Sequence, residues 1–248
     1  MGAGPADGGK PGDRFQVVAA ILRGFARGAF HPGEPAPWLE ILAREGVHPA
    51  SLALCCQGGD FRWVEPLRGV LARLEPGCRL VPEVSLDTIV AWSPLTYAHE
   101  IEYWHLGTPA AALPDSLLAL RGLRVQEAPR LRALGRGWAV VGRLQVLGLP
   151  RLEVLQGPLE VYGDLELAGL PELRDLGPGI AVHGNLTLAG CPGLAALPGD
   201  LRVDGAIWAD VRGAAMDPGR VASPWPGLRP APVAIAGFPA GVLELAAR

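Results

Sequence analysis

The chain has few of the residues that support several common classes of function. Its 248 residues include four cysteines, a single lysine (Lys10) and aromatic residues at 6% of positions, and its formal net charge is −3. No run of about 18 apolar residues is free of charge, so a membrane-spanning helix is not expected. Because charges of both signs are scattered along the chain, neither nucleic acid nor a membrane surface is an expected partner. These absences favour a soluble protein.

Motifs for a bound cofactor or metal are also missing from the sequence. It contains no C-x-x-C, no H-x-x-H or H-E-x-x-H, and no glycine-rich phosphate loop. We therefore predict no cofactor and no metal. The first 14 residues lack the basic segment and apolar core of a secretory signal. Four cysteines in a chain of this length do not form a disulfide framework, so we expect a cytoplasmic, bacterial protein.

Cys55 and Cys56 are the one pair of residues with evident reactive chemistry. Adjacent cysteines form only strained disulfides, and metal sites normally space their cysteines by two or more residues. The simpler interpretation is that both are buried apolar side chains that follow Leu52 and Leu54. A thiol redox or metal site near this pair and Asp60, in an enzyme that uses the rest of the chain as support, is the alternative.

The second half of the chain repeats with a period of 21 residues. Segments 138–155, 159–176 and 180–197 align without a gap, and a partial copy begins at Leu201. Each full copy follows the pattern L-x-V-x-G-x-L-x-L-x-G-x-P-x-L-x-x-L, with single departures. A strict period of this length is typical of a solenoid, in which each unit buries its apolar face only by stacking on its neighbours.

Within each copy the pattern predicts two short strands and two corners. Apolar residues alternate with other residues from Leu159 to Leu167, which is the spacing of an extended chain with one buried face. Gly163 falls on an inward position, where a missing side chain and an accessible positive φ would let the strand bend and split. Gly169 and Pro171 predict the next corner, and the two leucines that follow predict a tight helical turn or arc that closes the coil.

These copies resemble leucine-rich repeats. Residues 165–176 and 186–198 are similar to the L-x-L-x-x-N/C-x-L-x-x-L core of the short bacterial type, and the resemblance covers about residues 100–210. It implies a non-enzymatic binding scaffold. The usual Asn of the motif is leucine in two copies and Cys191 in a third, and the L-x-V-x-G segment adds a second strand to each coil. A plain parallel β-helix is therefore the competing solenoid.

The amino-terminal part has helical rather than extended spacing. Apolar residues from Arg14 onward predict a helix that ends at Gly33, a second helix is expected over Ala36–Arg44, and a third over Phe61–Leu74, capped by the preceding aspartate. Residues 79–92 have an extended pattern. We expect this part to cover the first coil of the solenoid, whose apolar edge would otherwise be open.

The sequence therefore predicts an α+β fold, a small helical part followed by a leucine-rich-repeat-like β-solenoid. The expected organisation is a disordered tail, a helical cap domain, the solenoid, and a Pro-rich wrap with a capping segment, over residues 1–13, 14–98, 99–212 and 213–248 respectively. In the worn copy at 101–113, Ile101 and Tyr103 fit the repeat with about one residue of slippage.

Outward positions of the repeat stack into columns that are mainly polar or aromatic. Such ladders on a rigid strand face are where a partner would bind, because interfaces favour aromatic residues and charges that can pair. We expect the partner to contact seven residues: Tyr162, Asp164, Glu166, His183, Asn185, Asp204 and Trp208. For any one of them, an ordinary solvated surface is the alternative.

The resulting prediction is a non-enzymatic scaffold that binds another protein through this face. His183 near Asp204 and Asp164 could form a catalytic or metal pair, but the columns supply no third ligand and no nucleophile with an evident base. Besides the thiol alternative, a structural role in an assembly remains open, with the solenoid ends stacking on other copies.

Overall fold

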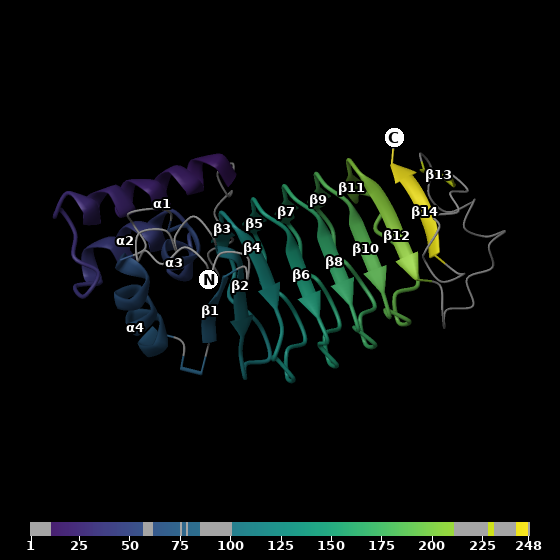
Figure 1. Ribbon diagram of the computed structural model, residues 1–248, viewed down its shortest axis with the longest axis horizontal. Coiled ribbons are helices and arrows are strands. Elements are labelled where there is room, and N and C mark those ends of the chain that lie inside the picture. Colours follow the sequence, from purple (N-terminus) through teal and green to yellow (C-terminus); the bar gives the residue numbers. More distant parts are fainter. Residues whose placement is uncertain are drawn as a thin grey trace, which may run out of the picture.

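The computed structural model describes residues 11–56, 62–74, 76–77, 79–84, 101–210, 228–230 and 242–247. A few helices come first, and a parallel-strand solenoid of about five coils follows (Figure 1). The helices are α1 (Pro11–Ala26), α2 (Ala36–Arg44), α3 (Ala50–Leu54) and α4 (Val64–Leu74). None of the helices in these ranges is both long and apolar enough to span a membrane. The predicted α+β class is confirmed.

Each coil contributes one strand to each of two sheets. The larger sheet has the order β1 (Arg79–Val84), β2 (Ile101–Gly107), β4 (Gly122–Val125), β6 (Leu144–Leu147), β8 (Leu165–Ala168), β10 (Leu186–Ala189), β12 (Ala206–Asp210), β14 (Val242–Ala247), β13 (Leu228–Pro230). The smaller sheet has the order β11 (Arg202–Val203), β9 (Ile180–Val182), β7 (Leu159–Val161), β5 (Trp138–Val140), β3 (Leu118–Ala119). The two strands per coil are therefore confirmed.

Neighbouring coils are in the register that the repeat predicts. Leu144 pairs with Leu165 and Leu165 pairs with Leu186, all in parallel strands. These inward leucines are fully buried. The third side of the coil is an arc in which isolated parallel bridges join Ala133 to Val154 and Val154 to Asp175. Each coil is thus three-sided, and its interior is filled by columns of identical or similar side chains.

The glycine column between the two strands is required by close approach of the coils. A Cβ on Gly163 would lie 2.7 Å from the carbonyl oxygen of Gly142 in the preceding coil, and Gly184 is placed similarly against Gly163. None of these glycines has a positive φ. The predicted bend at this position is confirmed. Glycine is required there by steric contact with the neighbouring backbone and not by a positive φ.

The other glycine column does adopt the left-handed conformation. Gly148, Gly169 and Gly190 have φ values of +61°, +65° and +62°, and the equivalent residue of the earlier coil, Glu127, has φ +54°. A non-glycine residue is uncommon in this region of φ/ψ space. The Gly-x-Pro corner was therefore correctly identified, and the first coil departs from it by one strained residue.

The first strand of the array is shifted by more than the sequence suggested. Trp104 pairs with Leu123 and Leu106 with Val125, a spacing of 19 residues, so the slippage is two residues. Trp104 and Leu106 consequently occupy the buried positions. The assignment of Ile101 and Tyr103 to the inward columns was wrong, because the degenerate copy keeps a leucine at one inward position, Leu106, but has Trp104 at the other, so the pattern does not identify its register.

The helical part matches its predicted elements with shifted ends. Helix α2 has the predicted bounds, and Gly46 follows it with φ +60°. Helix α1 begins at Pro11, a residue type suited to a first turn, and ends at Ala26 with Gly28 in the left-handed conformation, earlier than expected. Helix α4 begins at Val64 rather than Phe61, which places Pro66 in its first turn, where a missing N–H is tolerated. The short helix α3 was not predicted.

Helix α3 and its flanks cover the edge of the first coil, as expected of a cap. The Leu118 N–H donates to Ser51 Oγ at 3.0 Å, the His48 N–H donates to the Ser116 carbonyl at 3.0 Å, and the Leu120 N–H reaches the Leu54 carbonyl at 3.4 Å. These bonds occupy edge groups of β3 that would otherwise be open to pairing. Strand β1 covers β2 in the same way, by antiparallel pairing.

At the opposite end, Val242–Ala247, the segment expected to cap the solenoid, forms β14, which pairs antiparallel with β12. Several other expectations fall outside the described residues. These are residues 1–10 of the tail, the Asp60 cap, the extended pattern at 85–92, and most of the Pro-rich wrap.

Candidate functional site

The outward columns of the solenoid lie side by side across the corner where the smaller sheet turns into the larger. Tyr162, His183 and Asp204 follow β7, β9 and β11, and one backbone bond per coil holds them in register: the Tyr162 N–H donates to Val140, His183 to Val161, and Asp204 to Val182. The structure therefore brings the three residues into one line, as the repeat predicts.

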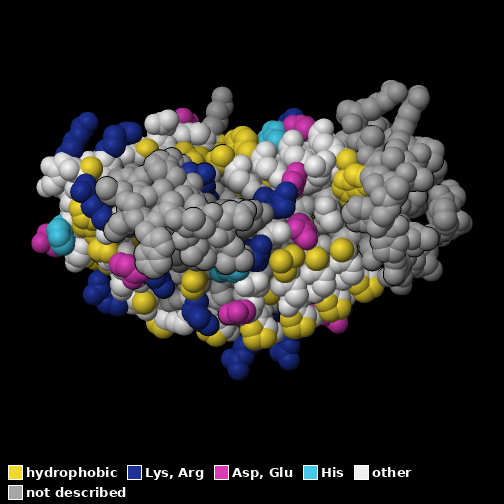
Figure 2. Space-filling model, viewed as in Figure 1, with side chains coloured by type: hydrophobic (Ala, Val, Ile, Leu, Met, Phe, Trp, Pro, Cys, Tyr) yellow, Lys and Arg dark blue, Asp and Glu magenta, His cyan; other side chains and the backbone are white. Residues whose placement is uncertain are grey.

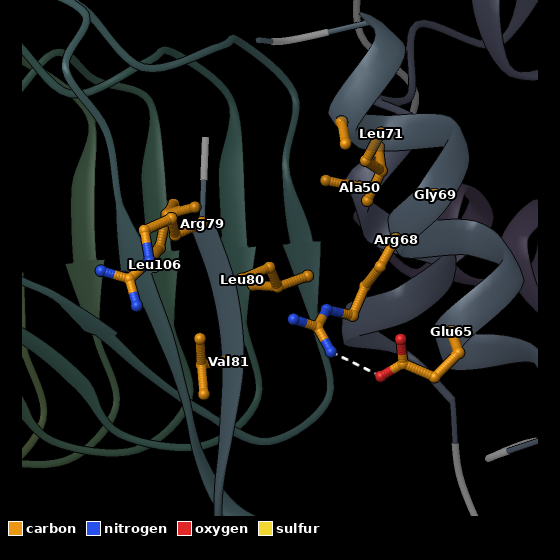
Figure 3. A pocket seen from close by; sticks show the side chains of 10 residues that line it. Ala50, Glu65, Arg68, Gly69, Leu71, Arg79, Leu80, Val81 and Leu106 are labelled. Atoms are coloured by element: carbon orange, nitrogen blue, oxygen red, sulfur yellow. Dashed lines mark hydrogen bonds and ion pairs between the residues drawn. The ribbon is translucent and has the colours of Figure 1, made fainter. Parts of the chain in front are cut away.

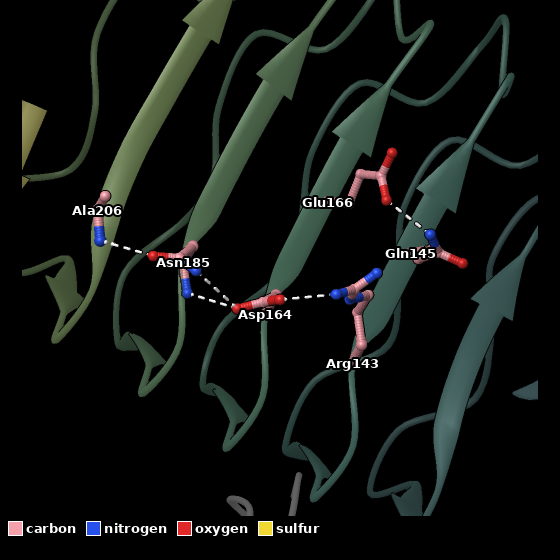
Figure 4. A network of polar contacts seen from close by, with 6 residues as sticks. All are labelled: Arg143, Gln145, Asp164, Glu166, Asn185 and Ala206. Atoms are coloured by element: carbon pink, nitrogen blue, oxygen red, sulfur yellow. Dashed lines mark hydrogen bonds and ion pairs between the residues drawn. The ribbon is translucent and has the colours of Figure 1, made fainter. Parts of the chain in front are cut away.

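Asp164 and Asn185 form a polar ladder at this corner (Figure 4). The Asp164 carboxylate accepts from the backbone N–H of Asn185 at 2.8 Å and from Arg143 at 2.9 Å, and Asn185 Oδ1 accepts from the Ala206 N–H at 2.9 Å. The backbone N–H of Asn185, and then Arg143, lower the pKa of Asp164 despite partial desolvation. Both side chains thus satisfy backbone groups of the next coil, which is a structural role.

Glu166 belongs to a second ladder on the larger sheet. Gln145 donates to Glu166 at 2.6 Å (Figure 4). Gln145 also accepts from Arg124 at 2.8 Å, so three coils are joined by side-chain hydrogen bonds. Trp208 continues this column, since it pairs in register with Thr187, but it is partly buried and β14 lies beside it. Its contribution to a binding surface is therefore smaller than predicted.

The most exposed part of the predicted site is centred on Tyr162. The Tyr162 ring is stacked on the His183 ring with a centroid distance of 4.9 Å and an interplanar angle of 18°. His183 Nδ1 lies 2.7 Å from Asp204, whereas Nε2 lies 3.5 Å from Glu160, too far for a strong hydrogen bond. Tyr162 is 43% exposed, and Val141 in the neighbouring coil is 41% exposed.

Two residues of this corner were missed by sequence reasoning. Glu160 lies outward on β7, and its carboxylate bonds to the Tyr162 hydroxyl; desolvation first, then this bond, raises the pKa of Tyr162. Its outward position in the alternation was a usable signal. Arg14 of α1 donates to the Gly137 carbonyl at 3.0 Å and interacts electrostatically with Glu160. Nothing in the sequence indicates that contact, because it depends on how the helical part docks.

The corner lacks the arrangement of a metal or hydrolytic centre. Asp204 and Glu160 approach opposite ring nitrogens of His183, so the three groups cannot converge on one ion. Within the described ranges, no group of three or more His, Cys, Asp or Glu residues is placed to hold a metal. The chemistry that this surface supports is non-covalent contact through an aromatic face and carboxylates.

Cys55 and Cys56 lie in the core beneath the first coil, with 3% and 4% of their surfaces exposed. The Cys55 thiol donates to the Leu118 carbonyl at 3.6 Å and the Cys56 thiol to the Leu52 carbonyl at 3.2 Å. Burial, and then the neighbouring Cys56, raise the pKa of the Cys55 thiol far above its ordinary range. Because the thiolate is the reactive form, Cys55 is expected to be inert, in line with the simpler interpretation.

A cavity of about 350 Å³ lies between α4 and β1 (Figure 3). Its apolar walls include Leu71, Leu80 and Leu106. The guanidinium groups at its margin already have acidic partners: Arg68 pairs with Glu65 in α4, and Arg79 pairs with Glu127 at 3.5 Å. Its described lining therefore offers shape and apolar contact rather than acid, base or nucleophile.

Charged side chains on the face shown in Figure 2 are of both signs and interspersed, with hydrophobic side chains in rows along the lower margin of the coils. No family model, curated protein or solved structure matches the chain. A functional assignment therefore depends on the geometry of the surface itself.

Proposed function

We propose that the protein is a non-enzymatic scaffold that binds another protein through the corner formed by Val141, Glu160, Tyr162, His183 and Asp204. The observation that carries the proposal is the exposure of Tyr162 and Val141 in adjacent coils, at 43% and 41%. The interior does not need an aromatic ring at this outward position, since the buried columns are complete without it. Exposed aromatic and apolar side chains held on a rigid strand face are typical of protein interfaces.

The predicted binding residues divide into two groups on this proposal. Asp164 and Asn185 bond to backbone groups of the following coil, so their main contribution is to the fold. Tyr162, His183 and Asp204 contact one another through side chains alone. The second group therefore contributes most of the contact, with Glu166 at the margin and Trp208 partly covered.

A leucine-rich-repeat-like scaffold in a bacterial cytoplasm remains part of the proposal. The L-x-L-x-x-N/C-x-L pattern and the in-register leucine columns support it. The three-sided coil, with its second sheet and its arc of isolated bridges, supports the parallel β-helix instead. Both architectures present a rigid strand face, so the proposed mode of binding does not depend on the choice between them.

Affinity purification from the native host tests the proposal. The wild type is compared with Tyr162→Ala/His183→Ala/Asp204→Ala and with a matched triple variant on the third side, Arg130→Ala/Glu153→Ala/Arg174→Ala, after circular dichroism has shown that all three are folded. A partner retained by the wild type and the matched variant, but lost by the corner variant, would support the scaffold. A partner that the corner variant still holds would contradict this location of the interface.

The thiol alternative has a direct test of its own. Because Cys55 and Cys56 are buried, we expect them to resist alkylation in the native protein and to react after denaturation. Rapid native alkylation of either residue, or stoichiometric metal by elemental analysis, would instead favour a reactive site in the helical part.

A further inference from the structure

The coil that contains Tyr162 differs in charge from the coils beside it. Its outward strand positions are, in order, Glu160, Tyr162, Asp164 and Glu166. On the two neighbouring coils, Arg143 is the one formally charged residue at the equivalent positions when His183 is neutral. An acidic line with an aromatic ring inside it therefore crosses an otherwise weakly charged face, and this line is here called the acidic rung.

The carboxylates of the acidic rung differ in how far they are already paired. Asp164 is paired with Arg143 at 2.9 Å. Glu166 is bonded to the neutral amide of Gln145 at 2.6 Å, and Glu160 is bonded to the neutral hydroxyl of Tyr162. Hydrogen bonds from neutral donors leave a carboxylate able to attract a cation. Glu160 also interacts electrostatically with Arg14 and lies 3.5 Å from His183 Nε2, but no charged donor hydrogen-bonds to Glu160 or Glu166 among the described residues. These two carboxylates, one on either side of the Tyr162 ring along the rung, are therefore the ones left to pair with a partner's cation.

Tyr162 is 43% exposed, and we take the face of its ring away from His183 as the accessible one. His183 is stacked on the other face, and the short side chain of Val141 lies in the adjacent coil toward the accessible one. A cation over an aromatic face is attracted by the ring quadrupole, and a planar guanidinium also stacks on the ring and pairs with a carboxylate. Lysine carries a compact, strongly hydrated charge and gains less from such a site.

We infer that the acidic rung receives an arginine-bearing extended segment of the partner, with a guanidinium on the accessible face of Tyr162 and its charge paired with Glu160, and with a second basic residue near Glu166. This inference rests on the proposed function, since it specifies the chemistry of the partner at the same corner. Alternate side chains of an extended segment point the same way and are about 6.6 Å apart, and Tyr162 and Glu166 are two such steps apart on the rung, so a segment with its two basic residues four positions apart suits the site.

Three peptides test the inference on the full chain by two-dimensional amide NMR. They are acetyl-Gly-Arg-Gly-Gly-Gly-Arg-Gly-amide, the same peptide with lysine, and the same peptide with citrulline, which keeps the shape of arginine without its charge. We expect the arginine peptide to shift amides of residues 138–147, 159–168 and 180–189 with a dissociation constant of about 1 mM, or −4 kcal/mol. The lysine peptide should bind at least about fivefold more weakly, and the citrulline peptide should cause no shift.

A pair of matched variants separates local recognition from general attraction. Glu160→Gln/Glu166→Gln should weaken the arginine peptide by about tenfold, because both available carboxylates are neutralised. Glu153→Gln/Glu172→Gln changes the net charge equally but on the third side, where these residues pair with Arg132 and Arg174, and should leave binding unchanged. Amide spectra of both variants without peptide check that the fold is intact.

Equal binding of the citrulline peptide, equal loss in both variants, shifts confined to another face, or no shift at 10-fold excess over the expected constant would each overturn the inference. The proposed function is judged separately. If a host partner is lost from Tyr162→Ala/His183→Ala/Asp204→Ala but not from Glu160→Gln/Glu166→Gln, the corner is an interface and only its preference for arginine is wrong.

Discussion

The solenoid and the helical part are held together by different kinds of packing. In the solenoid, each inward column repeats identical or similar residues, as in Leu144, Leu165 and Leu186, and every coil contacts mainly the next. In the helical part, dissimilar residues meet from separate elements: Phe25 of α1 packs edge-on against Trp38 of α2, with ring centroids 6.0 Å apart. Because its columns repeat, the core of the solenoid can be predicted from one sequence. The core of the helical part depends on tertiary contacts that the sequence does not repeat.

The same residue type also has different roles in the two regions. Gly163 and its column are held against the backbone of the preceding coil, whereas Gly69 in the interior of α4 has no atom within 4 Å of an added Cβ. In the solenoid, glycine is required by close approach; in the helix it only reduces stability. Four predictions, in order of decreasing effect, test this contrast.

The largest effect is expected from Leu165→Asp. Leu165 is fully buried in the middle of the array, so the substitution places an unpaired carboxylate inside the strand ladder. We expect a loss of more than about 4 kcal/mol of folding free energy and loss of the solenoid, measured by circular dichroism and thermal denaturation. Thr187→Asp, at an outward position, should cost far less. An unchanged thermal midpoint for Leu165→Asp would refute the inward assignment.

The glycine contrast predicts opposite signs for one substitution in two places. Gly163→Ala should destabilise the protein by about 2–3 kcal/mol, because the added Cβ overlaps the Gly142 carbonyl. Gly69→Ala should stabilise it by about 0.5–1 kcal/mol, because alanine favours the helix and meets open space. Chemical denaturation of both variants measures the difference, and equal effects would show that the coils are not packed as closely as described.

The junction between the regions is tested by Ser51→Ala. Ser51 is fully buried and accepts the Leu118 N–H, so its loss leaves a buried donor without that acceptor. We expect a cost of about 1–2 kcal/mol and faster amide exchange in β3, with little change in β8. Hydrogen exchange resolves the two strands. Uniform loosening of the whole array would mean that the cap and the coils unfold as one unit.

The smallest effect is a pH dependence that belongs to the solenoid. Since the pKa of Asp164 is lowered in the folded protein, its carboxylate stabilises the fold above the unfolded pKa of about 3.9, and this contribution is lost as pH falls through the folded value. The stability gap between wild type and Asp164→Asn should be under about 1 kcal/mol near neutral pH and should shrink below about pH 4. Glu153→Gln, on the third side, serves as the control for general charge effects. A stability difference between wild type and Asp164→Asn that grows in acid would contradict a lowered pKa of Asp164 in the folded protein.

Much of the solenoid could be read from the sequence because errors in one copy are corrected by the others. The two strands per coil, the Gly-x-Pro corner and the inward leucines follow from four aligned copies. In the degenerate first copy the prediction fails: Trp104, and not Tyr103, pairs with an inward leucine, because an error of one residue in placing a single copy exchanges its inward and outward positions. In the helical part, α2 was found from its proline and glycine borders, and the five-residue α3 was too short to show a period.

For the candidate site, the positions of the residues were predictable from the sequence and their roles were not. Columns of outward residues were predictable, since a fixed period places Tyr162, His183 and Asp204 in register. The roles of the outward residues were not predictable. Asp164 accepts a backbone N–H, whereas Tyr162 is exposed, and this difference depends on the direction that each side chain takes at the corner. Period alone carries no information about that direction.

By itself the sequence determined the repeat, the class of fold and the line along which the outward residues lie, because these depend on a residue spacing that recurs in every coil. Tertiary structure alone decided that α3 covers the first coil and that Arg14 reaches Gly137 near Glu160. Each of these contacts joins residues far apart in the chain that occur once, and a contact made once leaves no period in the sequence from which to infer it.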